Sequence, residues 1–447
     1  MKKTILIFIL VLFCIPMVFG AIVTNNNQSA LFIRFPARHA STDIDAVYYN
    51  PAGTTKLADG FHLALHNQSL FQEKTVTNML PFLNADTYIG DVKAPIFPSL
   101  FVVYKKGNLA ISFGFGPNAG GGSADFTTGL PSFEESFALF VPVMNLLFWP
   151  LPTTQYDVDI AFKGTSVYYG FQLNAAYAFH DMITVAVGGR FIYAANTYEG
   201  SISNVQFNTW HPLINPTADL MSAVTLFGAL FPPLAPAFAD MDVDAKEVGT
   251  AFTPIFSMNF NPVEGLNIGV RYELNTNLEL ETQTTIDDVG MFPDGFTFRS
   301  DIPAILALGM EYDIVPELKA AVSFTTYFDK NANWEGREAF VNSNTYDLAF
   351  ALQYAFSEKI AISAGYLMTK VDVADGYQVD LSHELSSSTI GFGGRFTASD
   401  NLSIDVGGIV VSYTDADVML DYDIFGPWME SYGRSSWGFT IGINYHK

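Results

Sequence analysis

The sequence predicts an all-β protein, a transmembrane antiparallel β-barrel of about 14 strands with an N-terminal hatch inside its lumen. Three observations predict this fold: a secretion signal, strand-length segments in which apolar and small residues alternate, and no later run of about 18 apolar residues. We expect a signal peptide at 1–20, the hatch at 21–60, and the barrel with long extracellular loops at 61–447. The expected location is the bacterial outer membrane.

The N-terminus has the three regions of a secretory signal peptide. Basic residues at 2–3 precede an apolar run over 5–19, and Val18 and Gly20 stand at the minus-three and minus-one positions of a cleavage site. The mature chain would therefore begin at Ala21. A single membrane-anchoring helix is the alternative, and the short apolar run disfavours it.

Charge and composition narrow the class of protein. The chain has 45 acidic and 22 basic residues, a formal net charge of −23, which excludes nucleic acid as a partner because phosphates require a basic face. Its single cysteine, Cys14, falls within the signal, so the mature protein has no disulfide and must be stabilised by a large core or by a membrane. A chain that is 49% hydrophobic and 15% aromatic fits a barrel, in which alternate residues face lipid.

Period-two alternation is the main evidence for the strands. Over 437–445, aromatic and branched residues alternate with Gly, Thr and Asn, and similar alternation occurs at 402–410, 346–356 and 166–179. The non-apolar positions are mostly Gly, Ala, Ser and Asn, with few charges. A soluble β-sandwich, the alternative fold, would present charged residues to solvent at these positions, so the pattern favours a barrel lumen.

Short polar turns alternate with long connections along the chain. The turns are predicted near 106–108, 180–181, 262–265, 315–317, 357–359 and 399–401. The long connections are predicted at 74–96, 118–164, 200–248, 283–299, 330–342, 374–382 and 416–432. Short turns at one end and long loops at the other are typical of outer-membrane barrels, and both ends of such a barrel lie on the periplasmic side. The first two strands are the least regular.

A barrel of about 14 strands leaves a hole that its own side chains do not fill. The stretch 21–60 precedes the first clear strand and lacks sustained period two, so we expect it to plug the lumen as the hatch. Its polar side chains can hydrogen-bond to a polar lumen wall; they include Arg34, Arg38, His39, Asp43 and Asp45.

The hatch contains a recognisable sequence. Residues 43–53, which read Asp-Ile-Asp-Ala-Val-Tyr-Tyr-Asn-Pro-Ala-Gly, resemble the N-terminal signature of the FadL/TodX family of outer-membrane transporters for long-chain fatty acids and other hydrophobic compounds. Residues 28–30 and 38–42 are similar to the entry segment of the same family. The resemblance implies a fourteen-stranded barrel whose hatch carries the motif, here Asn50, Pro51, Ala52 and Gly53.

The resemblance also implies a function and its partners. The expected function is passive diffusion of a hydrophobic small molecule, such as a long-chain fatty acid, across the outer membrane. The ligand would settle among extracellular loops, enter a tighter site in the barrel, and leave sideways at a kink in the third strand when the hatch shifts. The other expected partners are outer-membrane lipids and the barrel assembly machinery.

Glycine and proline end the third predicted strand. Gly114, Gly116 and Pro117 are the candidates for the strand kink, because these residue types mark bulges and interrupted pairing. A flexible loop start is the alternative interpretation.

Two predicted loops contain long apolar runs, which on a solvent-exposed surface usually mark a binding site. The candidate ligand-binding residues are Phe140, Phe148, Trp149, Phe227 and Phe231. The alternative is that the two loops pack on each other as a cap, and the two interpretations are compatible.

A carboxylate ligand in a low-dielectric lumen needs a cation, and Arg offers a planar pair of donors. Strand phase places Arg190, Arg271 and Arg395 on the lumen face. Internal pairing is the alternative, since Glu273 shares a face with Arg271, and Arg395 would face Asp405 across a hairpin. Arg190 is therefore the favoured candidate for ligand binding.

Three classes of function remain open: a plugged transporter of hydrophobic molecules, a general porin for hydrophilic solutes, and a surface adhesin or receptor without a transport role. The hatch and the apolar loops favour the first. We expect no enzyme activity, because nothing in the sequence assembles a nucleophile with a base. We also expect no cofactor and no metal. Asp240, Asp242, Asp244 and Glu247 resemble only part of a calcium loop, since Ala245 replaces the required Gly, and a solvated acidic loop is favoured.

Overall fold

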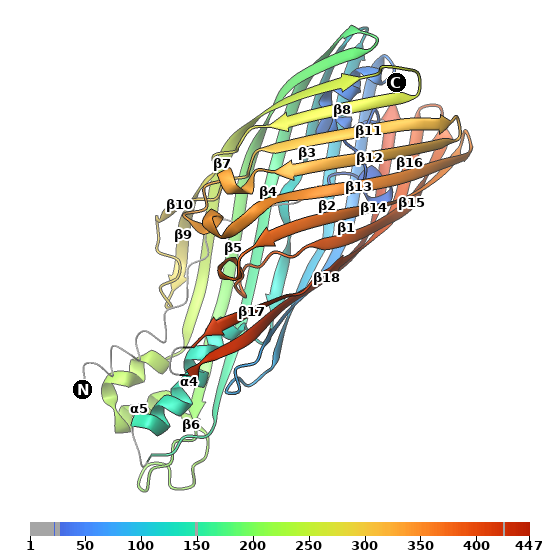
Figure 1. Cartoon of the computed structure of the whole chain (residues 1–447). Coiled ribbons are helices and arrows are strands. Elements are labelled where there is room, and N and C mark those ends of the chain that lie inside the picture. Colours follow the sequence, from blue (N-terminus) through green and yellow to red (C-terminus); the bar gives the residue numbers. More distant parts are fainter. Residues whose placement is uncertain (1–21, 23–26, 148–150, 423–424) are drawn as a thin grey trace.

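The computed structural model describes residues 22, 27–147, 151–422 and 425–447. The protein is a closed antiparallel β-barrel, which Figure 1 shows side-on as a long cylinder. The predicted fold class is confirmed, and so is the number of strands, which is 14. The predicted signal peptide at 1–20 lies outside the described residues.

The strands follow one another around the wall in sequence order. Three of them are interrupted and carry two labels each: β8 with β9, β10 with β11, and β16 with β17. The strands are β1 (Gly60–Asn78), β2 (Thr87–Lys106), β3 (Leu109–Phe126), β4 (Tyr156–His180), β5 (Ile183–Phe207), β7 (Met241–Phe260), β8 (Leu266–Glu273), β9 (Glu279–Asp287), β10 (Thr297–Arg299), β11 (Ile305–Val315), β12 (Leu318–Tyr327), β13 (Val341–Ser357), β14 (Ile360–Val373), β15 (Ser387–Ser399), β16 (Leu402–Tyr413), β17 (Ala416–Asp421) and β18 (Pro427–His446).

The barrel closes where β1 pairs with β18. The ladder continues to the last residue, because the backbones of Phe61 and Lys447 exchange two hydrogen bonds of 2.8 Å. The C-terminal residues therefore form part of the wall.

The strands are longer than the sequence predicts. β4 and β5 each have 25 residues, whereas about 9–11 residues suffice to cross a bilayer. Much of the ranges 74–96, 118–164 and 200–248, which were predicted to be loops, is strand, and that part of the prediction was wrong. Neighbouring strands extend together, so their backbone groups remain hydrogen-bonded to each other beyond the membrane. Their inward-facing side chains, such as Phe162, are buried beneath the loops.

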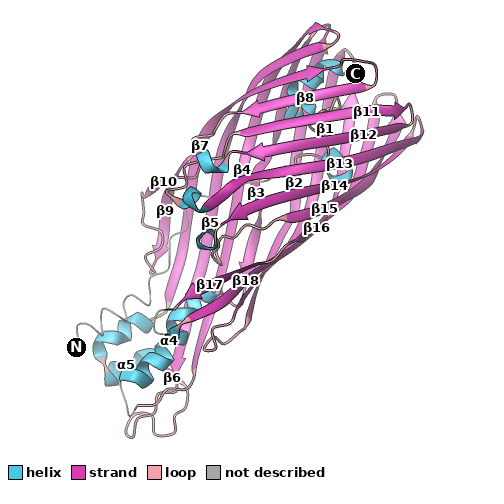
Figure 2. Cartoon of the chain, viewed as in Figure 1, coloured by secondary structure: helices cyan, strands magenta, loops and turns pink. Residues whose placement is uncertain are grey.

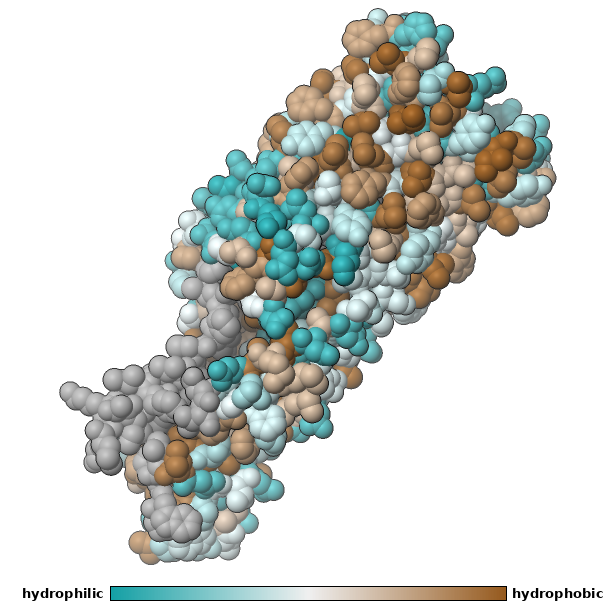
Figure 3. All heavy atoms as spheres, viewed as in Figure 1, coloured by the Kyte–Doolittle hydropathy of each residue, from teal (hydrophilic) through white to brown (hydrophobic). Residues whose placement is uncertain are grey.

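The outer face carries an apolar band at the short-turn end. On β18, Trp437, Phe439, Ile441, Ile443 and Tyr445 are each 41–53% exposed, whereas Thr440 between them is buried. Figure 3 shows hydrophobic side chains gathered over this part of the barrel and hydrophilic ones further along it. A band of this kind faces lipid, so we take 437–445 as the membrane-spanning segment of β18.

The hatch lies inside the barrel, close to the short-turn end (Figures 1 and 2). It contains the helices α2 (Ala30–Arg34) and α3 (Ala46–Tyr49) and the 3-10 helix η1 (Pro51–Lys56). Glycines on the lumen face let its backbone approach the wall: a Cβ on Gly269 would lie 2.1 Å from the His39 carbonyl oxygen, and one on Gly391 would lie 2.2 Å from that of Ile33. The abundance of lumen-facing glycine is therefore explained by contact with the hatch.

Helices from two long loops cover the opposite end of the barrel (Figure 2). We call the packed unit of α4 (Pro131–Leu147), α5 (Ala223–Leu230) and η2 (Pro232–Phe238) the cap. Its aromatic centre consists of Phe140, Phe227 and Phe238 packed with Phe207 of β5, with ring centroids 4.8–5.7 Å apart. The other elements in the long connections are β6 (Met221–Ser222), η3 (Asp329–Asn331), η4 (Arg337–Phe340) and η5 (Asp375–Tyr377). In the described part of the chain, no helix is long and apolar enough to span a membrane.

Candidate functional site

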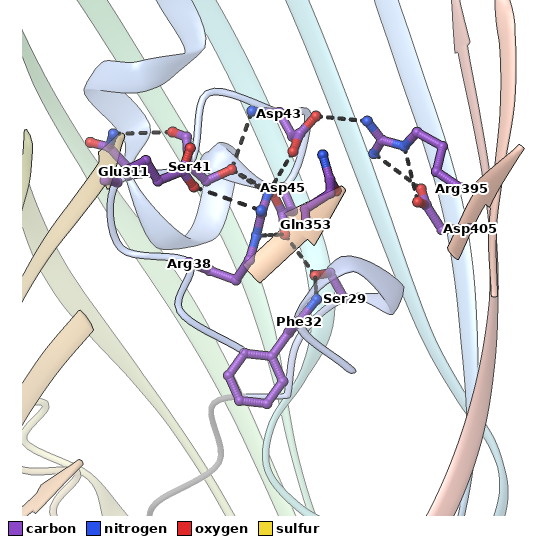
Figure 4. Close-up of polar contacts among 12 residues, drawn as sticks. Ser29, Phe32, Arg38, Ser41, Asp43, Asp45, Glu311, Gln353, Arg395 and Asp405 are labelled. Carbon is purple, nitrogen blue, oxygen red and sulfur yellow. Dashed lines mark hydrogen bonds and ion pairs between the residues drawn. The ribbon is translucent and has the colours of Figure 1, made fainter. Parts of the chain in front are cut away.

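The hatch is stabilised by an internal cluster of charges (Figure 4). The guanidinium of Arg38 donates to both oxygens of Asp45, at 2.6 and 3.0 Å, and to Asp43 at 2.9 Å. Asp43 in turn accepts a hydrogen bond of 3.0 Å from Arg395 of the wall. Arg395 also donates to Asp405 at 3.0 Å, the pairing that the hairpin phase predicts. The charges of the hatch and of the wall thus form one network.

The motif residues join the hatch to β7. The Asn50 side chain donates to Asn259 Oδ1 at 2.6 Å and to the Ser41 carbonyl oxygen at 3.1 Å, and it accepts from Ser257 at 3.1 Å. Pro51, Ala52 and Gly53 form the first turn of η1. At Gly53 a Cβ would lie 2.3 Å from the Ser41 carbonyl oxygen, so a larger residue does not fit there.

Arg190 and Arg271 both lie against the hatch. Arg190 forms an ion pair of 2.8 Å with Glu273 and also donates to Gln172. Arg271 lies 3.3 Å from Glu273 and donates to the Tyr48 carbonyl oxygen. The two guanidinium groups lie 4.7 and 4.8 Å from the centre of the Tyr48 ring.

A cavity of about 590 Å³ lies between the hatch and the cap, a size suited to a small-molecule ligand. Its floor includes Asn27 and Phe32 of the hatch segment, and its lining is otherwise drawn from strands around much of the barrel and from the long loops. None of the three arginines predicted to bind ligand lines it. They lie at the level of the hatch and pair with acidic residues there.

Other cations line the cavity instead. Lys74 of β1 and Arg434 of β18 face each other directly across the β1–β18 ladder. Arg434 donates a hydrogen bond of 2.7 Å to the His383 carbonyl oxygen and lies 3.8 Å from Glu384, while its buried Nε has no hydrogen-bond partner in the described part of the chain. Among the described residues none accepts a hydrogen bond from Lys74. Two like charges opposite each other in a ladder are unfavourable without an anion nearby, and Glu384, which also lines the cavity, is the one carboxylate near both of them among the described residues.

Sequence reasoning missed these cations because it placed Lys74 in a loop. The alternation along β18 could have identified Arg434, because it lies six residues from the lumen-facing Thr440 and an even spacing places both side chains on the same face of the strand.

The wall is interrupted between β2 and β3. Pairing stops after Lys93 with Ser123 and resumes at Leu100 with Phe115. β3 also bulges twice against β4 within 117–122. Cavity-lining residues on the two sides of this gap are Ala94, Phe97, Ala119, Gly120 and Gly122. The cavity therefore borders the break in the wall.

The predicted kink residues differ in their positions relative to this gap. Gly114 pairs regularly with Phe101 of β2, whereas Gly116 and Pro117 pair with β4 but have no partner on β2. Gly120, which belongs to the glycine run at 120–122 near the end of the same strand, has a φ of +65°, in the left-handed region that favours glycine.

The apolar loop candidates lie in or beside the cap. Phe140 and Phe227 are fully buried in its aromatic centre, and Phe231 is partly buried against the same cluster. Phe148 and Trp149 fall outside the described residues. The loops thus pack on each other, as the alternative interpretation anticipates, and ligand binding by these phenylalanines stays a prediction.

Solved structures share this fold. A FadL homologue from Pseudomonas aeruginosa matches with a TM-score of 0.62 at 12% identity, covering 96% of this chain and 99% of that one. The toluene transporter TodX of P. putida gives 0.57 at 12% identity over 91% and 95%. The toluene transporter TbuX of Ralstonia pickettii gives 0.55 at 13% identity over 95% and 100%. No protein-family model and no curated protein sequence matches the chain.

The closed barrel and its internal hatch define a class, the multi-pass outer-membrane β-barrel. Within that class the chain has the fold of the FadL family, as the motif at 43–53 predicts.

Proposed function

We propose that this protein is a passive channel through which hydrophobic small molecules cross the outer membrane. The observation that carries the proposal is the position of the cavity, which lies above a closed hatch and beside a break in the wall. A hydrophilic porin needs an open aqueous lumen, whereas the hatch here is bonded to the wall by a buried ion pair between Arg34 and Asp405 and by a half-buried one between Asp43 and Arg395. The neighbours of the same fold are named as a FadL homologue and as toluene transporters, which supports the same class of ligand.

The route that we propose runs from the cap to the cavity and then sideways between β2 and β3. An apolar molecule that leaves sideways passes from the cavity into lipid without being exposed to water. This avoids a free-energy cost of about 25 cal/mol for each Å² of apolar surface that water would otherwise contact. The interrupted pairing and the small residues at the gap support this exit.

We further propose that long-chain fatty acids are among the ligands. A carboxylate that enters the cavity needs a cation, because burying an unpaired charge costs several kcal/mol. Lys74 and Arg434 lie at the cavity surface and have unused hydrogen-bonding capacity, so they are better placed for this role than the three arginines predicted from the sequence.

The test is uptake of a radiolabelled long-chain fatty acid and of a hydrocarbon of similar length by a Gram-negative host that lacks its own channel for them. The variant Ser387→Trp fills the cavity, which Ser387 lines. Its neighbour Ser388 bonds to the exposed Tyr366 on the outer face, so Ser388→Trp is the matched control. We expect uptake of both compounds with the wild type and with the control, and loss of both with Ser387→Trp. No uptake by an assembled wild-type barrel, or a large steady conductance in planar bilayers, would contradict the proposal.

A further inference from the structure

The cavity has a second polar region, on the wall formed by β4, β5 and β7. Asn196 and Glu247 are paired across the β5–β7 ladder, and both line the cavity, with only 6% of each exposed. Asn196 Nδ2 donates to Glu247 Oε2 at 2.9 Å, and the Tyr198 hydroxyl donates to the same oxygen at 3.1 Å. We call these residues, with Tyr168 and Ser300 beside them at the cavity surface, the amide–carboxyl site.

One acceptor of this site has no donor among the described residues. The Oδ1 atom of Asn196 is buried, and no described residue donates a hydrogen bond to it. Both described donors to Glu247 reach Oε2, and within the described residues no ion pair is formed by its carboxyl group. A buried acceptor left unpaired costs about 1–3 kcal/mol, so an unpaired amide oxygen on a cavity-lining residue indicates a position that a ligand donor completes.

The donor is better supplied by a hydroxyl group than by an ammonium group. Both the cavity and the proposed sideways exit are largely apolar, and taking an ammonium ion out of water costs far more than taking out a hydroxyl. A hydroxyl also matches a site that presents an amide oxygen beside a carboxyl group already bonded by two neighbours.

We propose that the preferred ligand is a hydroxylated long-chain acid, whose hydroxyl group donates to Asn196 Oδ1 while its carboxylate lies at Lys74 and Arg434. This inference rests on the proposed function and names the ligand within that class. It gives a role to Glu247, which the sequence pattern places in a solvated acidic loop and which the structure places at the cavity surface. The parent fatty acid fits the same cavity but leaves the amide oxygen unpaired.

The test is competition against a fluorescent polyene fatty acid on the full mature protein in lipid nanodiscs. Octadecanoic acid is compared with its positional hydroxy isomers and with the methyl ether of each isomer, which keeps the oxygen but cannot donate. We expect at least one hydroxy isomer to bind about three- to tenfold more tightly than octadecanoic acid, the net effect of one hydrogen bond, and its ether to lose that advantage. No isomer preference, or equal binding of alcohol and ether, would overturn the inference, and neither result depends on a variant folding.

A variant then assigns the preference to the site. Asn196→Leu has a similar shape but lacks both the amide oxygen and the Nδ2 donor to Glu247, which keeps its hydrogen bond from Tyr198. The readout is the ratio of the affinities for the hydroxy isomer and for octadecanoic acid, which should fall to about one. The exposed Asn342 provides the control Asn342→Leu, which should behave as the wild type. A preference that survives in an assembled Asn196→Leu protein would reject the assignment. Failure of every acid and hydrocarbon to bind the wild type would instead reject the proposed function.

Discussion

Arg190 and Glu273 form a two-point ion pair in the lumen, with 2.8 Å from Nη1 to Oε2 and 3.0 Å from Nη2 to Oε1. Both side chains are almost completely buried. The guanidinium of Arg190 also lies over the ring of Tyr48, so the pair joins the wall to the hatch. Arg271 contacts the same carboxylate from the other side, at 3.3 Å, and one acid therefore neutralises two cations.

The first prediction follows from that imbalance. Glu273→Gln leaves two buried guanidinium groups unpaired, whereas Arg190→Met leaves Glu273 with Arg271. Removing one partner of a buried pair costs about 3–5 kcal/mol, and we expect Glu273→Gln to reach this range and Arg190→Met to cost less. Urea unfolding of the barrel in vesicles measures both free energies. Equal losses in the two variants would mean that Arg271 does not compensate for Arg190.

The Arg190→Met variant also tests the role that the sequence predicts for Arg190. If Arg190 bound the ligand carboxylate, the affinity for a fatty acid would fall and that for a hydrocarbon of similar length would not. Because Arg190 is outside the cavity lining, we expect both affinities to be unchanged.

The second prediction concerns the hatch motif. Replacing Asn50 and Pro51 together with Ala removes three hydrogen bonds to Ser41, Ser257 and Asn259 and also the fixed φ of proline. Each buried partner left unpaired costs about 1–3 kcal/mol, so the hatch should open more often. Hydrogen–deuterium exchange should accelerate over 30–56 while the heat-dependent gel shift of the barrel persists. The exposed Asn108 gives the control Asn108→Ala, and wild-type exchange in an assembled double variant would reject the role of the motif.

The third prediction concerns the break in the wall. Deleting Asn118 and Gly121, the two residues left unpaired by the bulges, aligns the remaining residues of β3 continuously with 166–169 of β4. A straight β3 can pair with β2, so we expect the gap to close and uptake to fall to that of cells without the channel. Ligand binding in the cavity should persist. Deleting the exposed Pro216 and Thr217 is the control, and full uptake by the bulge deletion would place the exit elsewhere.

The fourth prediction concerns the cations of the cavity. Arg434→Gln and Lys74→Gln should each weaken binding of a long-chain fatty acid by about 1.5–3 kcal/mol, the range for hydrogen bonds to charged groups. Binding of a hydrocarbon of similar length should not change. The exposed Lys93 of β2 supplies the control Lys93→Gln. Equal weakening for both ligands would show that these cations support the wall rather than the carboxylate.

The fold followed from the sequence because alternation is a local property of each strand. Trp437, Phe439 and Ile441 face outward whatever surrounds them, and the turn at 399–401 pairs Arg395 with Asp405 through register alone. The number of strands and the pairing of each hairpin could therefore be predicted.

The site depends on contacts between residues far apart in the chain. No local pattern shows that Lys74 faces Arg434, because that pair depends on closure of the barrel. The strand ends far from the short turns were predicted to be loops for a related reason. Their outward-facing residues are polar, as in loops, and they are extended only because they pair with neighbouring strands. Arg190 illustrates the limit, because its lumen-facing position was predicted but its partner Glu273, two strands along the wall, was not.

Two carboxyl groups, one in the cap and one on the wall beside it, should make the cap sensitive to pH. Glu135 of α4 accepts a hydrogen bond from Tyr422, and Glu430 accepts hydrogen bonds from Asn78 and Tyr432. Burial raises the pKa of Glu135 to about 7 and, with help from the nearby charge of Asp380, raises the pKa of Glu430 to about 8. Glu430 lies on β18 well beyond the membrane-spanning segment 437–445, and Glu135 lies in a loop helix.

The fifth prediction follows from these raised values. A carboxyl group whose pKa is higher in the folded state than in the unfolded state stabilises the folded state when it is protonated. Its contribution to the free energy of unfolding is therefore complete below about pH 4.5 and is lost as pH rises through about 7–8. Full ionisation removes at most about 3 kcal/mol for a shift of the size seen at Glu135. After correction for intrinsic rates, hydrogen–deuterium exchange in α4 should therefore be faster at pH 9 than at pH 5. The double variant Glu135→Gln with Glu430→Gln stays neutral and should lose this dependence, whereas Glu358→Gln in an exposed turn should keep it. Exchange that is equally fast at both values in the wild type would mean that other contacts, chiefly the aromatic centre around Phe140, hold the cap without these acids.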